Sequence, residues 1–234
     1  DALGVDMSTI EAFALSHGHL DHVGGIDQLS SLVGKKGIDL VLHPDAFRNP
    51  RYLKITDDFK VFFPAFTREK AEAAGVRLVE IEKPYPMIDG NILFLGGIPR
   101  RTAFEKGSPN LCYEEDGVEK QDPMDDDSAL VFNVRNKGLV ILSGCAHAGI
   151  VNTVEYAREV TGVHEIFAVM GGFHLTGADM DAVIVPTTQA LKALNPVYII
   201  PTHCTGRAAV MYIEKEMPDK FLLNMSGTRM TFAG

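Results

Sequence analysis

The chain has 234 residues, of which 46% are hydrophobic and 23% are charged, and its formal net charge is −9. This composition is ordinary for a folded domain, and the length suits one domain covering residues 1–234. The negative charge argues against a surface that neutralises the phosphates of long nucleic acids, so we expect no nucleic-acid partner.

The cysteines and the apolar runs bear on where the protein works. Cys112, Cys145 and Cys204 show no paired spacing, which favours a reducing compartment. No apolar run approaches the ~20 residues of a membrane span, and no signal peptide opens the chain. We therefore expect a cytoplasmic protein without membrane contact, and the sequence leaves a homodimer open.

Strand-like and helix-like stretches alternate along the chain, which predicts an α/β or layered αββα architecture. Short apolar runs predict strands at residues 11–16, 38–42, 76–81, 92–95, 130–134, 139–142, 166–170 and 197–200. Helical patterns predict helices at residues 23–33, 67–74, 150–160, 179–194 and 205–217, and Pro186 is expected to kink or restart the fourth. Residues 221–223 and 228–232 are expected to close the second sheet.

Residues 96–127 differ from the rest of the chain. The stretch is long and polar, and Pro99, Pro109 and Pro123 interrupt it. Loops of this length in compact domains are usually functional or mobile. We interpret the stretch as a lid or substrate-binding loop, with a disordered surface insertion as the alternative.

Four metal-ligand side chains lie within six residues after the first predicted strand. They are His17, His19, Asp21 and His22, and Gly18 removes side-chain bulk between the two leading histidines. Imidazole and carboxylate are good ligands for borderline divalent metals. A tight loop at a strand end lets such side chains converge, so the motif predicts a metal site.

Three later histidines stand in similar places. His147, His174 and His203 each come just after an apolar strand, beside glycine or small residues. Functional sites in α/β sheets gather at such strand ends, so we expect these side chains to join the site. His43 also ends a strand but resembles an ordinary strand-end residue, and His164 is expected to be structural or exposed.

The motif H-x-H-x-D-H followed by Gly-Gly resembles the signature of the metallo-β-lactamase superfamily. A finer resemblance is to the branch named for 7,8-dihydropterin-6-methyl-4-(β-D-ribofuranosyl)aminobenzene-5′-phosphate synthase. The segments that carry it are L-S-H-G-H-L-D-H-V-G-G (15–25), G-G-I-P-R (97–101, counting Arg101), D-D-S-A-L (126–130), S-G-C-A-H-A-G-I-V-N-T (143–153), G-G-F-H-L (171–175) and P-T-H-C-T-G (201–206). The first segment indicates the superfamily, and the others point to the branch.

The resemblance implies a four-layer αβ/βα sandwich with a two-metal centre. Zinc is the ion we expect first, with iron, manganese or magnesium as alternatives, and bound ions would lower the pKa of a water between them. The implied ligands are, for one ion, His17, His19 and a third histidine that we assign as His147, and, for the other, Asp21, His22 and His203.

Two superfamily segments are changed in this chain. The usual G-H-T-x-G segment with its third histidine is missing, and Asp125-Asp126-Asp127 stands near its place. We favour His147 as the replacement ligand, with Asp126 as the alternative. Cys145 stands where the superfamily has a bridging Asp, and we interpret it as a small buried residue, with a thiolate ligand as the alternative.

The start of the chain is a further departure. The superfamily fold normally opens with strands that precede the histidine motif, whereas here the motif begins at residue 17. We therefore expect the amino-terminal strands to be missing, with an exposed edge or a gap in the first sheet. Such a gap bears on stability more than on metal ligation.

The leading functional hypothesis is metal-assisted hydrolysis of a phosphorylated or cyclic small molecule. Asp21 is a candidate for orienting the nucleophile, and His174 for donating a proton or contacting substrate. Arg100 and Arg101 are candidates for binding an anionic substrate, with solvated surface charge as the alternative. The partner we expect is therefore a small anionic molecule.

Three other functions remain open at this point. The synthase-like branch suggests a transferase that joins a pterin to a phosphoribosyl compound. Single-iron sulfur dioxygenases share the H-x-H-x-D-H motif, and a metal-binding protein without turnover would also use it. Fold analogy cannot choose among these functions, because one scaffold hosts many chemistries.

Overall fold

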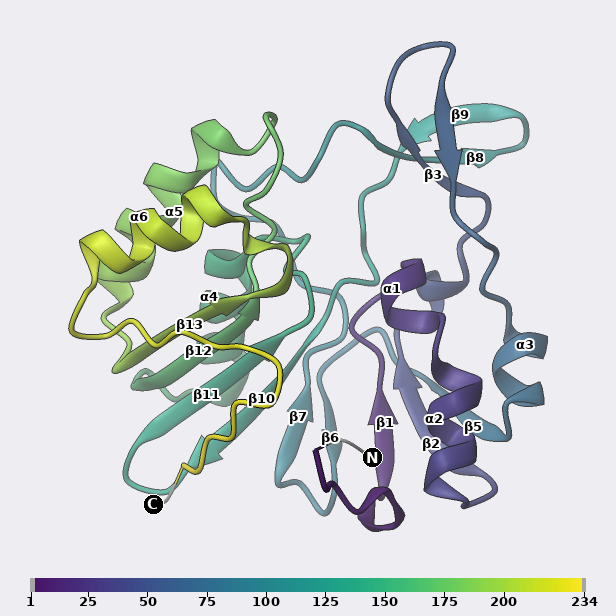
Figure 1. The fold of residues 1–234 in the computed structure, drawn as a ribbon, viewed down its shortest axis with the longest axis horizontal. Helices are drawn as coiled ribbons and strands as arrows, with labels where there is room; N and C mark the ends of the chain where they lie inside the picture. The colour runs from purple at the N-terminus through teal and green to yellow at the C-terminus, as the bar shows by residue number, and fades with distance from the viewer. Residues whose placement is uncertain (1–2, 233–234) are drawn as a thin grey trace.

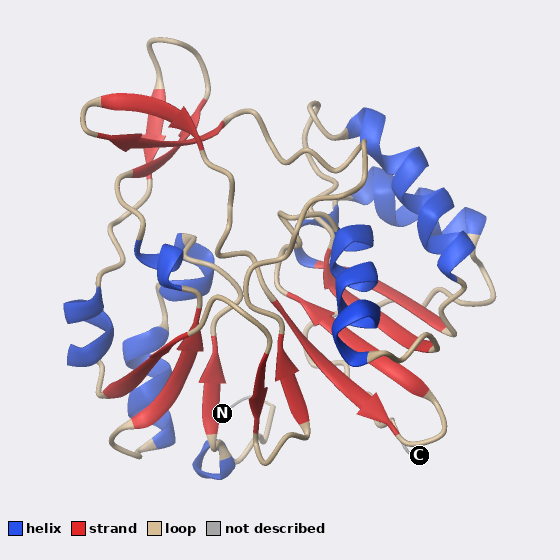
Figure 2. Ribbon diagram, turned by 180° about the vertical axis from the view of Figure 1, so that it is seen from behind, coloured by secondary structure: helices blue, strands red, loops and turns tan. Residues whose placement is uncertain are grey.

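A computed structural model describes residues 3–232 and shows four layers. Two β-sheets face each other, and helices cover the outer face of each (Figure 1). The view from behind shows the same arrangement, with a small third sheet standing away from the two main ones (Figure 2). The expected αβ/βα sandwich is confirmed. None of the helices within the described residues is long and apolar enough to cross a membrane.

The first main sheet is parallel, with strand order β1-β2-β5. Its strands are β1 (Ala12–Ala14), β2 (Ile38–Leu42) and β5 (Val76–Glu80). Leu40 and Leu42 of β2 pack with Val33 and Ala71 of the helices, because alternate side chains of a strand face the same side. The elements that accompany this sheet are η1 (Met7–Thr9), α1 (Leu20–Val23), α2 (Ile26–Val33), η2 (Pro44–Phe47) and α3 (Arg68–Ala73).

The second main sheet has strand order β13-β12-β11-β10-β7-β6, and β11, β12 and β13 run parallel. Its strands are β6 (Tyr85–Met87), β7 (Ile92–Phe94), β10 (Ala129–Val134), β11 (Gly138–Ser143), β12 (Ile166–Gly172) and β13 (Tyr198–Thr202). The helices against it are α4 (Ile150–Thr161), α5 (Asp181–Leu194) and α6 (Arg207–Glu216), and η3 (His203–Thr205) follows β13. The large helical core lies on this side.

Both faces of β11 are buried, which explains the continuous apolar run in its sequence. Leu139 and Ile141 join the core under the helices, whereas Val140 faces the other side and joins a cluster that includes Phe232. Both faces of the strand are therefore covered, as is typical of strands in the middle of an α/β sheet.

The third sheet corrects the interpretation of residues 96–127. That stretch is not a structureless loop, because it contains β8 (Leu111–Glu115) and β9 (Val118–Gln121). These strands join β3 (Arg51–Lys54) and β4 (Lys60–Phe62) in an antiparallel sheet of order β4-β3-β8-β9. The partners are about sixty positions apart in sequence, so no local pattern reveals the pairing.

Other predicted boundaries changed in detail. The helix expected at residues 23–33 is divided into α1 and α2 at Gly24 and Gly25. The helix α5 runs through Pro186 without restarting. Residues 221–223 contribute a single bridge between Phe221 and Ile199, and residues 228–232 form no strand, so their expected closure of the sheet is wrong.

Candidate metal centre

The ends of four strands bring the candidate ligands together. The histidine motif follows β1, Cys145 and His147 follow β11, His174 follows β12, and His203 follows β13. Because β11, β12 and β13 are parallel, their carboxyl ends lie at one edge of the sheet. His174 and His203 have positive φ angles of 44° and 51°, a conformation that costs about 1–3 kcal/mol and concentrates at functional sites.

His17, His19 and His147 form one group, which we call the inner cluster. One ligand atom from each lies within 4.8 Å of the others. All three side chains are buried, and among residues 3–232 their Nε2 atoms find no hydrogen-bond partner. Buried polar atoms without partners are costly, so three of them meeting at one place fit the ligand set of a metal ion.

Burial also sets the protonation of the inner cluster. It lowers the pKa of His17 and His147 well below the ordinary value, and neighbouring imidazoles add to the effect. Burial lowers the pKa of His19 to about 4. The three rings are therefore neutral near pH 7, which leaves each with the lone pair that a metal ligand needs.

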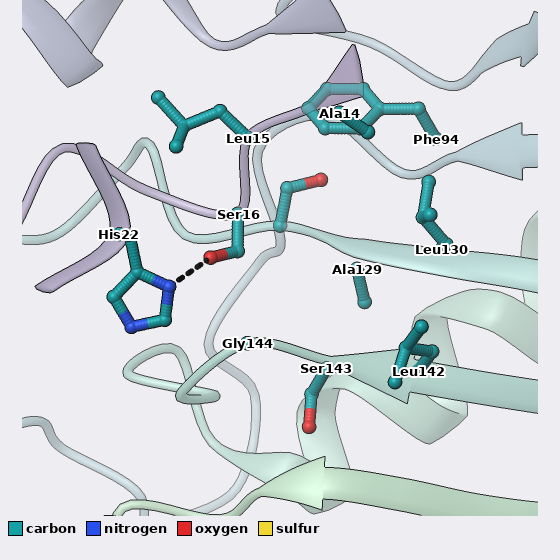
Figure 3. A pocket seen from close by; sticks show the side chains of 11 residues that line it. Ala14, Leu15, Ser16, His22, Phe94, Ala129, Leu130, Leu142, Ser143 and Gly144 are labelled. Carbon is teal, nitrogen blue, oxygen red and sulfur yellow. Dashed lines mark hydrogen bonds between the residues drawn. The ribbon is translucent and has the colours of Figure 1, made fainter. Parts of the chain in front are cut away.

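Ser16 orients one ring of the inner cluster and a second ring beside it. Its Oγ lies 3.1 Å from Nδ1 of His17 and 3.1 Å from Nδ1 of His22. Figure 3 shows the bond to His22. A hydroxyl oxygen can accept two hydrogen bonds, so both Nδ1 atoms can carry protons and both Nε2 atoms can stay free of them. That tautomer presents Nε2 as the metal ligand.

Asp21, His22, Cys145 and His203 form a second group, which we call the outer cluster. The Oδ2 atom of Asp21 lies 3.4 Å from His22 Nε2 and 3.3 Å from His203 Nε2. The Asp21 side chain is 58% exposed and that of His203 is 42% exposed, so this group faces solvent. The rings of His17 and His22 are only 4.1 Å apart, which places the two clusters side by side.

A pair of thiols borders the outer cluster. The hydrogen bond with Cys145 lowers the pKa of the Cys204 thiol to about 5, whereas the same bond and burial raise the pKa of the Cys145 thiol. The Sγ atom of Cys204 also lies 3.6 Å from the carbonyl oxygen of Cys145.

A buried ion pair supports the loop that carries the leading histidines. Asp126 accepts a 2.8 Å hydrogen bond from the backbone N–H of Gly18 and two more from Arg51, at 2.9 and 2.6 Å. Asp126 is therefore occupied outside both clusters, which leaves His147 as the third histidine of the inner cluster. Gly18 is required there, since a Cβ atom would lie 2.1 Å from the carbonyl oxygen of Ala46.

The clusters form part of the lining of a cavity of about 510 Å³. The ring of Phe63 lies 5.0 Å from that of His19, and His174 lies 4.0 Å from His147. Ser108 donates a 2.6 Å hydrogen bond to Asp179 at the border of the same cavity. The third sheet and its adjoining turns contribute an apolar part of the lining, which we call the apolar wall and which is made of Leu53, Ile55, Phe63 and Leu111.

Comparison with curated proteins shows to which family the chain belongs. The chain is 34% identical over 226 residues to the 7,8-dihydropterin-6-methyl-4-(β-D-ribofuranosyl)aminobenzene-5′-phosphate synthase of Methanocaldococcus jannaschii, covering 93% of this chain and 74% of the relative. The chain belongs to this synthase family. The family resemblance that the sequence motifs indicated is thereby confirmed.

Two further comparisons found one relative and one solved structure. An uncharacterized protein of the same organism, MJ0448, is 34% identical over 202 residues, covering 84% of this chain and 69% of the relative. The crystal structure of Tm1679, described as a metal-dependent hydrolase of the β-lactamase superfamily, matches with a TM-score of 0.82 and 25% identity. That match covers 100% of this chain and 83% of Tm1679. No protein-family model matches the chain.

The structure does not bring the two predicted substrate arginines to the cavity of this family member. Arg100 donates hydrogen bonds of 2.5 Å to the carbonyl oxygen of His147 and 2.7 Å to that of Pro123. Arg101 pairs with Glu159 on the surface of α4. Arg100 therefore positions the loop that carries His147, and the surface alternative describes Arg101.

The remaining polar candidates also have places. Asp125 is an exposed residue that pairs with Arg48 at 3.5 Å. His43 accepts a hydrogen bond from the backbone of Asp45 and lies outside both clusters. His164 is exposed, and its Nδ1 lies 3.3 Å from Arg158.

Sequence reasoning missed two features of the site, which are Arg51 and the apolar wall. It did consider Cys145, which is buried as we expected and also lies within the outer cluster. The signal for Arg51 was weak, because a single arginine in a short strand gives no hint of the carboxylates that it meets.

Proposed function

We propose that this chain is a metal-dependent hydrolase of small molecules. The observation that carries the proposal is the inner cluster, where three buried and neutral imidazoles direct unpartnered nitrogens to one place. Its neighbour supplies Asp21, His22 and His203 for a second ion. When bound, such ions polarise the substrate and lower the pKa of a coordinated water.

The chain's own groups then have separate tasks. Asp21 is exposed at the border of the cavity, where its carboxylate can orient a water toward the substrate. His174 lines the cavity beside His147 and can donate a proton to a leaving group. Ser16 holds two ligand rings in the required tautomer.

The lining of the cavity favours a substrate with an apolar or aromatic part. The apolar wall lines the same cavity as the clusters, so such a part can lie on Phe63 and Leu53 while the reacting group meets the ions. Lys54 also lines the cavity, but its ammonium already pairs with Asp57 and Glu119. A phosphoryl group or a strained ring would therefore be held mainly by the ions, as an aryl phosphate or a cyclic ester allows.

The test combines metal analysis with product analysis. Purified protein is incubated with aryl phosphates, cyclic phosphodiesters and lactones, before and after chelation and after zinc is restored. We expect two ions per chain and a hydrolysis that stops on chelation and returns with zinc. His147→Ala should abolish turnover, whereas the surface control His164→Ala should not. Turnover that survives complete metal removal would overturn the proposal.

A second candidate is a transferase of the synthase type. The observation that favours it is the 34% identity to the named synthase over 93% of the chain. Incubation with a dihydropterin and a ribofuranosylaminobenzene phosphate would distinguish the two functions by their products. A product that joins both substrates would establish the transferase, and release of hydrolysed fragments alone would exclude it.

A further inference from the structure

We propose that Cys145 is a thiolate ligand of a divalent ion held by the outer cluster. Its Sγ atom lies 3.2 Å from Nε2 of His22, and the ligand atoms of all four outer-cluster residues lie within 4.8 Å of one another. The side chain is buried at 3% exposure, so its sulfur is directed into the protein and toward the other ligands.

Three separations within the outer cluster are close to those in a tetrahedral shell. Bonds of about 2.0–2.3 Å to nitrogen, oxygen and sulfur place neighbouring ligand atoms roughly 3.3–3.8 Å apart in tetrahedral zinc sites. The measured separations are 3.2 Å from Cys145 to His22, 3.4 Å from His22 to Asp21, and 3.3 Å from Asp21 to His203. Three successive edges of the group thus lie near the expected length.

Close contacts surround the Cys145–His22 pair. The preceding residue, Gly144, packs so closely on Ser16 that a Cβ atom would lie 2.2 Å from its Oγ. Figure 3 shows Gly144 near the Ser16–His22 pair. The contact from Ser16 to Nδ1 of His22 leaves Nε2 free for the 3.2 Å contact with Cys145.

A sulfur ligand makes the two ion positions unequal. With Cys145, the outer cluster offers four protein ligands, as closed zinc sites do, whereas the inner cluster offers three and leaves one position open. A carboxylate and a thiolate together cancel the charge of a divalent ion, whereas three neutral imidazoles cancel none. The inner ion is therefore the stronger Lewis acid and the one with room for water or substrate.

A Cys145 thiol that only donates a hydrogen bond to His22 would give the same distance as a thiolate ligand. X-ray absorption on the zinc-loaded, unmutated protein distinguishes the thiol from the thiolate ligand. A thiolate ligand predicts a zinc–sulfur shell at about 2.3 Å beside nitrogen and oxygen shells at about 2.0–2.1 Å. Spectra of the two-zinc protein that need no sulfur shell would overturn the proposal.

Cobalt-loaded variants identify which cysteine binds. Protein with two Co²⁺ ions should show a sulfur-to-cobalt charge-transfer band in the near ultraviolet. Cys145→Ser should lose the band and bind the second ion at least about 10–100-fold more weakly, since even outer-shell partners contribute that much. Cys145→Asp should keep two ions without the band, because a carboxylate replaces the thiolate.

The controls are the two other cysteines. Cys112 belongs to β8 and to neither cluster, whereas Cys204 contacts the Cys145 thiol. The Cys112→Ser and Cys204→Ser variants should both keep the charge-transfer band. A band that persists in Cys145→Ser, or disappears in Cys204→Ser instead, would contradict the assignment. The inference rests on the metal binding of the proposed function but not on its reaction. A sulfur-ligated protein that hydrolyses nothing would contradict the proposed function alone.

Discussion

The two sides of the cavity are built by different physical means. The clusters stand on strand ends of the sandwich and depend on buried polar groups, such as the Gly18 N–H bonded to Asp126. The apolar wall stands on the third sheet, where Glu119 links Lys54 and Lys60 through ion pairs of 2.8 and 2.6 Å at partly exposed positions. The candidate metal ligands are thus held by buried polar contacts, whereas the apolar wall is held by partly exposed ion pairs, which contribute less to stability.

The largest effect is expected on the cluster side. His17→Ala should remove one ion per chain and lower kcat/KM by more than the about 10–100-fold that outer-shell changes cost, because it deletes a ligand itself. Elemental analysis and steady-state kinetics measure both quantities. Phe63→Ala on the apolar wall should keep both ions. Loss of an ion in the Phe63→Ala variant would contradict the distinction between the metal-binding clusters and the apolar wall.

The next effect concerns the link between the two sides. Arg51 belongs to β3 yet lies buried against Asp126 and Asp122, so Arg51→Met should lower the free energy of unfolding by about 3–5 kcal/mol. The matched control is Arg77→Met. The Arg77 side chain is 70% exposed where it pairs with Asp39, so this ion pair should contribute at most about 1 kcal/mol to the free energy of unfolding. Equal losses in urea unfolding of the two variants would contradict this ranking.

A smaller effect is expected on the apolar wall. Phe63→Ala should raise KM about tenfold, the factor that corresponds to 1.4 kcal/mol of lost binding, and change kcat little. The ring touches His19 but provides no ligand atom, so it contributes to binding and not to the reacting centre. A fall in kcat with unchanged KM would assign the residue to the cluster side instead.

The smallest effect depends on pH. Hydrogen bonds from Lys54, Lys60 and Tyr52 lower the pKa of Glu119 from 4.5 to about 2. A lowered carboxyl pKa stabilises the fold above the ordinary value and ceases to do so as pH falls through the folded value. The difference in Tm between wild type and Glu119→Gln should therefore shrink between about pH 4.5 and 2. A difference that stays constant over this range would exclude Glu119 as a support of the third sheet.

The sequence signals for the two clusters are local, and the structure brings those side chains together. Each histidine of the clusters follows an apolar strand, and His17 to His22 form one short motif. The apolar wall was not predictable in this way, since β3 and β8 pair across about sixty residues and both are short. Cys145 lies between these cases, because its position in the chain was visible but only the fold shows which side chains surround it.

The buried Arg51 also determines how the cavity can admit a ligand. Moving the third sheet away from the main sheets at Arg51 would disrupt the buried ion pairs of Arg51 with Asp122 and Asp126, at a cost of several kcal/mol. Parting Ser108 from Asp179 at the opposite margin gives up one hydrogen bond, worth about 1 kcal/mol. The contacts at Arg51 therefore cost more to break than the contact at Ser108, so we expect the margin of the cavity at residues 108 and 179 to open first when a ligand enters.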